Sequence, residues 1–245
     1  MYPVLFRIGG LTFYTYGLML GLGFAAGVYV ASKRAEKEGV DPDSLFWFFI
    51  AILAGGVVGG RITHVALNLR YYTDFLSIID TREGGLAIHG VLIGGTIAAL
   101  IYSRVKRIHF LGLMDIIAPS VALGQGIGRI GCFFSGCCYG IKTSGTWGFE
   151  TRYAPGLRHP YQLYESVLDL ALFVALLYLA SRIKTPGGLF TVYAGGYSAI
   201  RFFLEFFRDN DDYFLGLSFG QWFSLVTLLV ATATFIGLRR RARTG

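Results

Sequence analysis

The sequence predicts an all-α, polytopic integral membrane protein with about seven transmembrane helices. Hydrophobic residues make up 54% of the 245-residue chain and charged residues 15%, whereas soluble domains carry about 25% charged residues. The apolar residues also come in blocks, each close to the roughly 20 residues that a helix needs to cross a bilayer core. A soluble helical protein with so many apolar runs would have almost no residues left for a polar exterior, which excludes that class.

Seven apolar segments are candidate membrane spans. They run approximately over residues 11–31, 45–68, 86–103, 111–131, 161–181, 187–207 and 219–238. The first segment could instead be a cleavable signal peptide. Only Arg7 precedes it, however, and the cationic run SKRAEKE follows it, which is the wrong charge order for such a peptide. We therefore expect a single membrane-embedded domain over residues 1–245, with a small external segment at about 132–160.

The basic residues predict how the chain is oriented, because cytoplasmic loops collect Lys and Arg. With the N-terminus outside, the inner segments are SKRAEKEGVDPD, SRVKRIHF, SRIKTP and RRRARTG, and they hold more than half of the 22 Lys and Arg residues. We expect an external N-terminus and a cytoplasmic C-terminus. The net charge of +7 then reflects topology, and since no nucleic-acid-binding or nucleotide motif accompanies it, we expect no nucleic-acid partner.

Polar side chains within the spans concentrate near one side of the membrane. Ionisable groups in hydrocarbon cost about 2.5–3.5 kcal/mol each on insertion scales, and they usually mark a site. In the predicted orientation Asp115 lies near an inner helix end, and the others lie near outer ends. The outer group consists of Arg61, His64, His89, Arg129, Gln162, Glu165, Asp169, Arg201, Glu205 and Gln221. This distribution predicts a functional site in the outer leaflet.

The stretch YSAIRFFLEFFR shows the pattern most clearly. Tyr197, Arg201, Glu205 and Arg208 are spaced four, four and three residues apart, so they share one face of a helix. A self-neutralising Arg201–Glu205 ion pair is the simplest interpretation, but it does not account for the arginines of the other spans. A surplus of guanidinium groups predicts an anionic ligand, because the planar fork of arginine donates two parallel hydrogen bonds to phosphate.

Glycines are frequent, with 34 in the chain. Those of the second and third spans form small-xxx-small pairs, which indicate close helix packing; they are Gly55, Gly56, Gly59, Gly60, Gly90, Gly94 and Gly95. The glycines of the fourth span are denser and predict a helix that thins or breaks near its outer end, exposing backbone N–H groups to an anion. They are Gly124, Gly126, Gly128 and Gly131.

Several stretches resemble motifs of the bacterial prolipoprotein diacylglyceryl transferase family, and the similarity covers nearly the whole chain. They are GGRITH, GGLAIHGVLIGG, GRIGCFFSGCCYG, HPYQLYES, YSAIRFFLEFFRDND and FGQWFS. The third matches the family signature, usually written G-R-x-G-N-F-x-N-x-E-x-x-G. It departs from the signature at three positions, where Cys132 and Ser135 replace asparagines and Cys137 replaces the glutamate.

The resemblance implies a transferase that moves the diacylglyceryl group of phosphatidylglycerol to the lipobox cysteine thiol of prolipoproteins. The products are a thioether and glycerol phosphate. The implied partners are phosphatidylglycerol, the prolipoprotein signal peptide with its lipobox, and membrane lipids. The implied location is the bacterial plasma (inner) membrane, with the active site facing the outer leaflet and with no cofactor or metal. Two alternatives are a related membrane transferase with a different lipid or acceptor, and a lipid transporter, although we find no inverted repeat typical of transporters.

This reaction assigns roles to particular residues. The leaving group is an anionic phosphate ester, so we expect Arg129 and Arg201 to hold it. Only a thiolate attacks well, so we expect His89 to act as the base. A packing histidine and an interfacial anchor are the structural alternatives for His89 and Arg129. The further predicted substrate-binding residues are Arg61, Gln162, Tyr197, Glu205, Arg208 and Cys132.

The three cysteines, Cys132, Cys137 and Cys138, are open to four interpretations. They could pack where the family has amides, or Cys132 could form a disulfide with either of the others in an oxidising outer compartment. One could be a reactive thiol that carries the lipid transiently. A zinc site is the fourth, although the C-x4-C-C spacing is poor for zinc and no fourth ligand is evident. We expect scaffolding rather than nucleophilic thiols, with Arg129 binding the lipid phosphate.

Overall fold

The computed structural model describes the chain except for residues 1–2, 10, 73, 81–83, 210–212 and 245. The chain divides into two compact units, one made of Met1–Ala31 with Met114–Gly245 and the other of Ser32–Leu113. The single domain expected over residues 1–245 stays a prediction.

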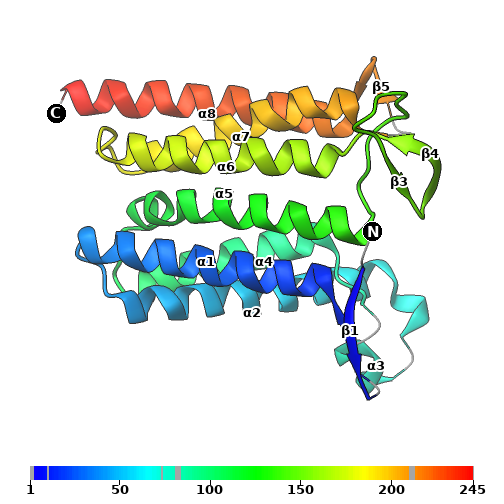
Figure 1. Ribbon diagram of the computed structural model, residues 1–245. Coiled ribbons are helices and arrows are strands. Elements are labelled where there is room, and N and C mark those ends of the chain that lie inside the picture. The colour runs from blue at the N-terminus through cyan, green and yellow to red at the C-terminus, as the bar shows by residue number, and fades with distance from the viewer. Residues whose placement is uncertain (1–2, 10, 73, 81–83, 210–212, 245) are drawn as a thin grey trace. The chain divides into compact units, whose positions relative to one another are not determined.

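Helices dominate both units, as predicted (Figure 1). The long helices are α1 (Thr15–Lys37), α2 (Pro42–Leu67), α4 (Ile88–Val105), α5 (Phe110–Ser135), α6 (Tyr161–Ala180), α7 (Gly188–Leu204) and α8 (Phe219–Thr244). The short ones are η1 (Leu69–Tyr71), α3 (Phe75–Ile79) and η2 (Glu205–Phe207). Antiparallel hairpins pair β1 (Val4–Ile8) with β2 (Leu11–Tyr14), β3 (Phe149–Thr151) with β4 (Ala154–Arg158), and β5 (Tyr213–Phe214) with β6 (Leu217–Ser218).

Each predicted span corresponds to one long helix. Within the part of the chain that the structure describes, six helices are long and apolar enough to cross a membrane. Helix α7 has 17 residues and is not among them, so the seventh span stays a prediction. The predicted start of the first span was wrong, because Leu11–Tyr14 forms strand β2 and the helix begins at Thr15. Threonine and aromatic residues suit a strand, and β1 supplies the pairing partner.

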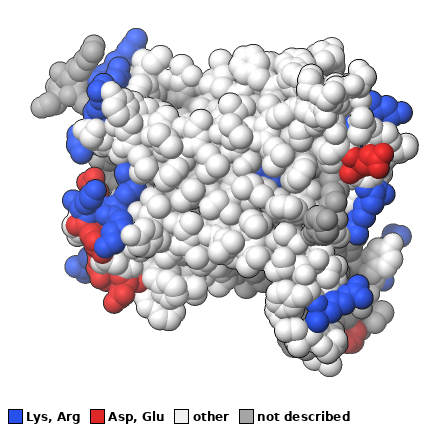
Figure 2. Space-filling model, viewed as in Figure 1, with Lys and Arg blue, Asp and Glu red and all other residues white. Residues whose placement is uncertain are grey.

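The distribution of charge over the helices agrees with a membrane protein. On the face seen in Figure 2, charged side chains gather at the helix ends, and the middle stretches of the helices are nearly free of them. Many apolar side chains in these stretches are exposed, among them Val58, Leu92, Val174 and Val230. Contiguous exposed apolar surface of this kind is rare in soluble monomers, and here it is surface that lipid can cover.

In the unit Ser32–Leu113, α2 and α4 pack closely along their glycines. Asp41 caps the start of α2 by accepting hydrogen bonds from the backbone N–H groups of Asp43 and Ser44, a common N-terminal signal. A Cβ atom added at Gly94 would clash with the carbonyl oxygen of Gly55. The backbones therefore approach as the small-xxx-small pattern predicted, and that prediction is confirmed.

In the other unit, α6, α7 and α8 lie side by side (Figure 1), and α5 contributes to the same core. Buried residues of this core include Ala118 and Ala122 of α5, Leu176 of α6, and Leu189 of α7.

Contacts within the same unit account for Asp115, the polar residue that the sequence placed near an inner helix end. The carboxylate oxygens of Asp115 each accept a hydrogen bond of 2.7 Å, from the backbone N–H groups of Gly187 and Phe190. These N–H groups lie at the start of α7, where intrahelical partners are missing. Asp115 is therefore an N-terminal cap supplied by a neighbouring helix.

The sequence predicted that α5 thins or breaks near its outer end, and the break was wrong. The helix continues through Gly124, Gly126, Gly128 and Gly131 to Ser135. Gly126 lies against Leu170, and Gly131 lies against Tyr16 and Met19. Because glycine has no side chain, neighbouring helices can approach α5 closely at these positions. The glycines do not interrupt the hydrogen bonding of the helix.

Candidate functional site

A buried carboxylate joins two arginines from different helices. Glu165 of α6 is fully buried, and its Oε1 lies 2.8 Å from Nη2 of Arg129 on α5. Its Oε2 lies 3.6 Å from Nη1 of Arg201 on α7. Three helices therefore bring charged side chains, which are costly to bury, into contact with one another. The sequence predicted this convergence from their positions near the helix ends.

A second carboxylate extends the network. Oε2 of Glu205 lies 2.9 Å from Nη2 of Arg201, and Oε1 lies 3.6 Å from Nη1 of Arg208. The hydroxyl of Ser218 donates a further hydrogen bond of 3.3 Å to Oε1. The predicted Arg201–Glu205 pair therefore exists, but as part of a network in which three guanidinium groups contact two carboxylates. The contacting groups carry an excess of positive charge.

Two tyrosines complete the surroundings of Glu165. Arg201 donates a short hydrogen bond to the hydroxyl of the buried Tyr161. Tyr197 donates one of 3.4 Å to Oε1 of Glu165, and its ring stacks on Tyr193 with centroids 6.2 Å apart. Our reading of the sequence placed Glu165 in the outer polar layer but assigned no role to it or to Tyr161. Tyr161 and Glu165 are four residues apart in α6, and this spacing could have predicted that they share one helix face.

The exposure of the side chains shows which groups face outward. The arginine side chains of Arg129, Arg201 and Arg208 are 24%, 14% and 33% exposed. The carboxylate side chains of Glu165 and Glu205 are 0% and 3% exposed. The cations are partly exposed, whereas the anions are buried. Such a layer is suited to bind an anion, because the two buried carboxylates fix the three guanidinium groups but cancel only part of their charge.

Two other buried polar residues of α6 have different surroundings. Asp169, one turn beyond Glu165, is fully buried, and neither of its carboxyl oxygens has a hydrogen-bond partner among the described residues. Gln162 is also fully buried, and its amide donates a short hydrogen bond to the carbonyl of Cys137. Gln162 therefore anchors the segment that follows α5, and its predicted contact with substrate stays a prediction.

The structure brings the three cysteines together. Cys132 lies in the last turn of α5, and the chain then reverses through Gly136 and Cys138, whose φ angles of 82° and 59° are left-handed. The three Sγ atoms lie within 4.8 Å of one another, and all three thiols are free. A hydrogen bond with Cys132, opposed by burial and assisted by Arg129 and Arg208, lowers the pKa of Cys138 to about 5.

His89 and Arg61 belong to the other unit. His89 is the second residue of α4, and its side chain is exposed. Arg61 is buried, and all five of its N–H groups donate to backbone carbonyls. Their acceptors are the carbonyl oxygens of Ser77, Ile78, Asp80, Gly84 and Gly85. Arg61 fastens the segment between α2 and α4, so its predicted substrate contact would require some of these bonds to break.

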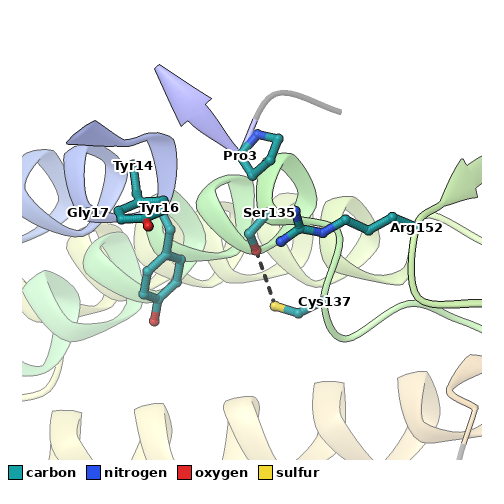
Figure 3. A pocket seen from close by; sticks show the side chains of 7 residues that line it. All are labelled: Pro3, Tyr14, Tyr16, Gly17, Ser135, Cys137 and Arg152. Atoms are coloured by element: carbon teal, nitrogen blue, oxygen red, sulfur yellow. Dashed lines mark hydrogen bonds between the residues drawn. The ribbon is translucent and has the colours of Figure 1, made fainter. Parts of the chain in front are cut away.

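A cavity of about 360 Å³ opens beside the cysteines, and its lining is drawn in Figure 3. It is lined by Pro3, Tyr14, Tyr16, Gly17, Ser135, Cys137 and Arg152. Ser135 donates a hydrogen bond of 3.3 Å to Sγ of Cys137. The side chain of Arg152 extends toward Ser135 (Figure 3). Our sequence predictions did not include Arg152 or this cavity, because they depend on where the N-terminal strands meet the end of α5.

Comparison with known proteins agrees with the motifs. Residues 3–237 match the family model described as prolipoprotein diacylglyceryl transferase. A phosphatidylglycerol–prolipoprotein diacylglyceryl transferase of Clostridium tetani is 36% identical over 96% of this chain and 97% of its own length. A protein of the same name from Geobacter sulfurreducens is 37% identical over 96% of this chain and 92% of its own length. The chain belongs to the prolipoprotein diacylglyceryl transferase family.

Proposed function

We propose that this protein transfers the diacylglyceryl group of phosphatidylglycerol to the cysteine thiol of a prolipoprotein lipobox. The sulfur attacks the glyceryl carbon that carries the phosphate, so a carbon–sulfur bond forms as the carbon–oxygen bond breaks. The electron pair of the broken bond leaves with the phosphate oxygen of glycerol phosphate. The thiol proton passes to a base, for which His89 is our candidate.

The observation that carries the proposal is the convergence of Arg129 and Arg201 on the buried Glu165. The leaving group is a phosphate ester, and its negative charge grows as the carbon–oxygen bond breaks. Guanidinium groups already fixed in position stabilise such charge without reorganising during the reaction. In this proposal Glu165 and Glu205 are positioning residues, while Arg129 and Arg201 contact the phosphate and Arg208 adds positive charge at the more exposed edge.

The exposed apolar faces of the helices support the choice of a lipid substrate. A phospholipid can reach a site within the membrane sideways, with its acyl chains in the hydrocarbon and its headgroup near the arginines. We also propose that the protein resides in the bacterial inner membrane and that its site opens toward the outer leaflet, where secreted prolipoproteins emerge. Both proposals depend on the predicted orientation of the chain.

The direct test uses the purified full-length protein in nanodiscs containing phosphatidylglycerol, with a synthetic peptide that carries a lipobox. We expect a diacylglyceryl thioether on the peptide cysteine by mass spectrometry, and one glycerol phosphate released per adduct. A peptide with serine in place of that cysteine, and nanodiscs of phosphatidylethanolamine alone, are the controls. A folded protein that forms no adduct on the cysteine peptide, or that modifies the serine peptide equally well, would refute the proposal.

A further inference from the structure

The cluster formed by Cys132, Cys137 and Cys138 takes no part in the proposed reaction, because the acceptor thiol belongs to the substrate peptide. The three sulfur atoms nevertheless lie within 4.8 Å of one another, because the chain reverses direction after Cys132. Three neighbouring thiols can bind one metal ion together.

We propose that Cys132, Cys137 and Cys138 form a three-thiolate binding site for a soft metal ion of the Zn²⁺, Cd²⁺ or Cu⁺ class. Thiolates select such ions over the hard cations Mg²⁺ and Ca²⁺. The site goes beyond the transferase activity and does not depend on it.

The distances between the sulfur atoms suit a shared ion. Three sulfurs at about 2.3 Å from one zinc-sized ion are about 3.8–4.0 Å apart. The Sγ atoms of Cys137 and Cys138 are 3.3 Å apart, and no pair exceeds 4.8 Å, so shifts of less than about 1 Å complete the geometry. A disulfide between Cys137 and Cys138 is less suitable, because consecutive Cα atoms are about 3.8 Å apart and disulfides usually need about 4.4–6.8 Å.

The segment that carries the thiols is held in place before any ion binds. The hydroxyl of Thr151 donates a hydrogen bond of 2.8 Å to the carbonyl of Gly136, and Gln162 donates one to the carbonyl of Cys137. The backbone of Cys138 is left-handed, with φ 59°, a conformation that is unfavourable for a non-glycine residue. Strain of this kind persists where the surroundings impose it and often marks a functional position.

The reversal at Gly136 and Cys138 also explains why spacing alone argued against a metal site. Known zinc motifs place their cysteines on short, regular spacings, whereas here the left-handed residues fold the C-x4-C-C segment back on the end of α5. The sequence shows the spacing but not the two φ angles that decide which sulfurs meet.

The surroundings of the cysteine cluster are compatible with the negative charge of a three-thiolate metal complex. Three thiolates and one divalent ion form a complex with one negative charge, and each thiol that is still protonated releases its proton to solvent when the ion binds. Arg129 and Arg208 both act electrostatically on the sulfur of Cys138, so the negative charge of the complex would lie near two guanidinium groups.

Titration with Cd²⁺ tests the proposal. The full-length protein, reduced and freed of metal in detergent at pH 7, should bind one Cd²⁺ per chain and develop the ultraviolet sulfur-to-cadmium charge-transfer absorption. Cys132→Ser, Cys137→Ser and Cys138→Ser should each weaken binding at least tenfold, whereas Ser135→Ala, which alters a neighbour of the sulfurs, should bind as the unchanged protein does. Absence of the absorption, or unchanged binding in any one cysteine variant, would overturn the three-thiolate site.

A second measurement covers variants that do not fold. In the unchanged protein, bound Cd²⁺ should protect all three thiols from alkylation by iodoacetamide, counted by mass spectrometry. Protection of two thiols or fewer would contradict the proposal. So would a disulfide from Cys132 to either neighbour in protein alkylated at the moment of harvest, because the thiols would then be oxidised at rest.

Discussion

Two carboxyl groups on one face of α6 have opposite surroundings, although both are fully buried. Glu165 contacts Arg129 and Arg201, whereas Asp169 has no hydrogen-bond partner among the described residues. A buried charge is tolerated when it is paired, and an unpaired buried polar group lowers stability. Comparing Glu165 with Asp169 therefore shows how much an ion pair contributes to the stability of a buried carboxylate.

We predict opposite effects for Glu165→Gln and Asp169→Asn. Breaking a buried ion pair by removing one partner costs about 3–5 kcal/mol, so Glu165→Gln should lower the melting temperature in detergent markedly. Asp169→Asn removes a carboxyl with no direct cation partner and should leave the melting temperature unchanged or higher. Thermal unfolding of both variants in the same detergent measures this. If Asp169→Asn is the more damaging change, an interaction of Asp169 outside the network must matter more than its geometry indicates.

The arginines themselves give a second prediction at this scale. Arg129→Ala and Arg201→Ala should each reduce transfer at least about a hundredfold, as loss of one preorganised donor does in other enzymes. Lysine at either position should recover little, because its point charge cannot reproduce a bidentate fork. Rates of adduct formation by variants that still fold measure the effect. Near-normal rates in both alanine variants would show that the phosphate is held elsewhere.

At the scale of elements, the contact between α2 and α4 depends on glycines whose backbones nearly touch. A Cβ atom at Gly94 would meet the backbone of Gly55, which cannot move aside, whereas one at Gly95 would be 3.5 Å from a side-chain carbon of Ile52. The two neighbouring glycines of α4 therefore differ in the space they have, although their residue type is the same.

We predict that Gly94→Ala destabilises the protein and that Gly95→Ala, its matched control, does not. Forcing atoms into a packed contact costs about 1–3 kcal/mol, while alanine in open helix positions is favourable relative to glycine. Melting temperatures in detergent distinguish the two. Equal stability of both variants would mean that α2 and α4 are less closely packed than described.

Helices were predictable from the sequence, but contacts between them were only partly so. Hydrophobic runs fix where helices form, and the boundaries of α6 were predicted within one residue. Two contacts were not predictable, because each joins residues far apart in the chain. Asp115 caps a distant helix, and Arg61 donates hydrogen bonds to the backbone of a distant loop. Glycine content predicted close packing correctly for α2 and α4 but a break incorrectly for α5, since composition does not show which neighbour approaches.

At the scale of the whole molecule, the charges of the loops carry information that the fold of each unit does not. The basic segments SKRAEKE, SRVKR, SRIK and RRRAR alternate along the chain with segments poorer in Lys and Arg. Positive loops are retained in the cytoplasm, so the alternation predicts on which side each helix end lies. The Arg129–Glu165–Arg201 network would then belong to the outer leaflet.

Reporter fusions test this orientation. A reporter fused after Arg243 should be active in the cytoplasm, because a cationic segment forms the end of α8 there. One inserted between Lys142 and Arg158, in the segment that joins α5 to α6, should be active outside. Phosphatase and fluorescent-protein fusions at both positions, compared at equal expression, measure this. An external C-terminus would reverse every helix and move the arginine network to the inner leaflet. Secreted prolipoproteins could not then present their cysteines to it from outside, and the proposed route of the acceptor would fail even if the arginines bind phosphate.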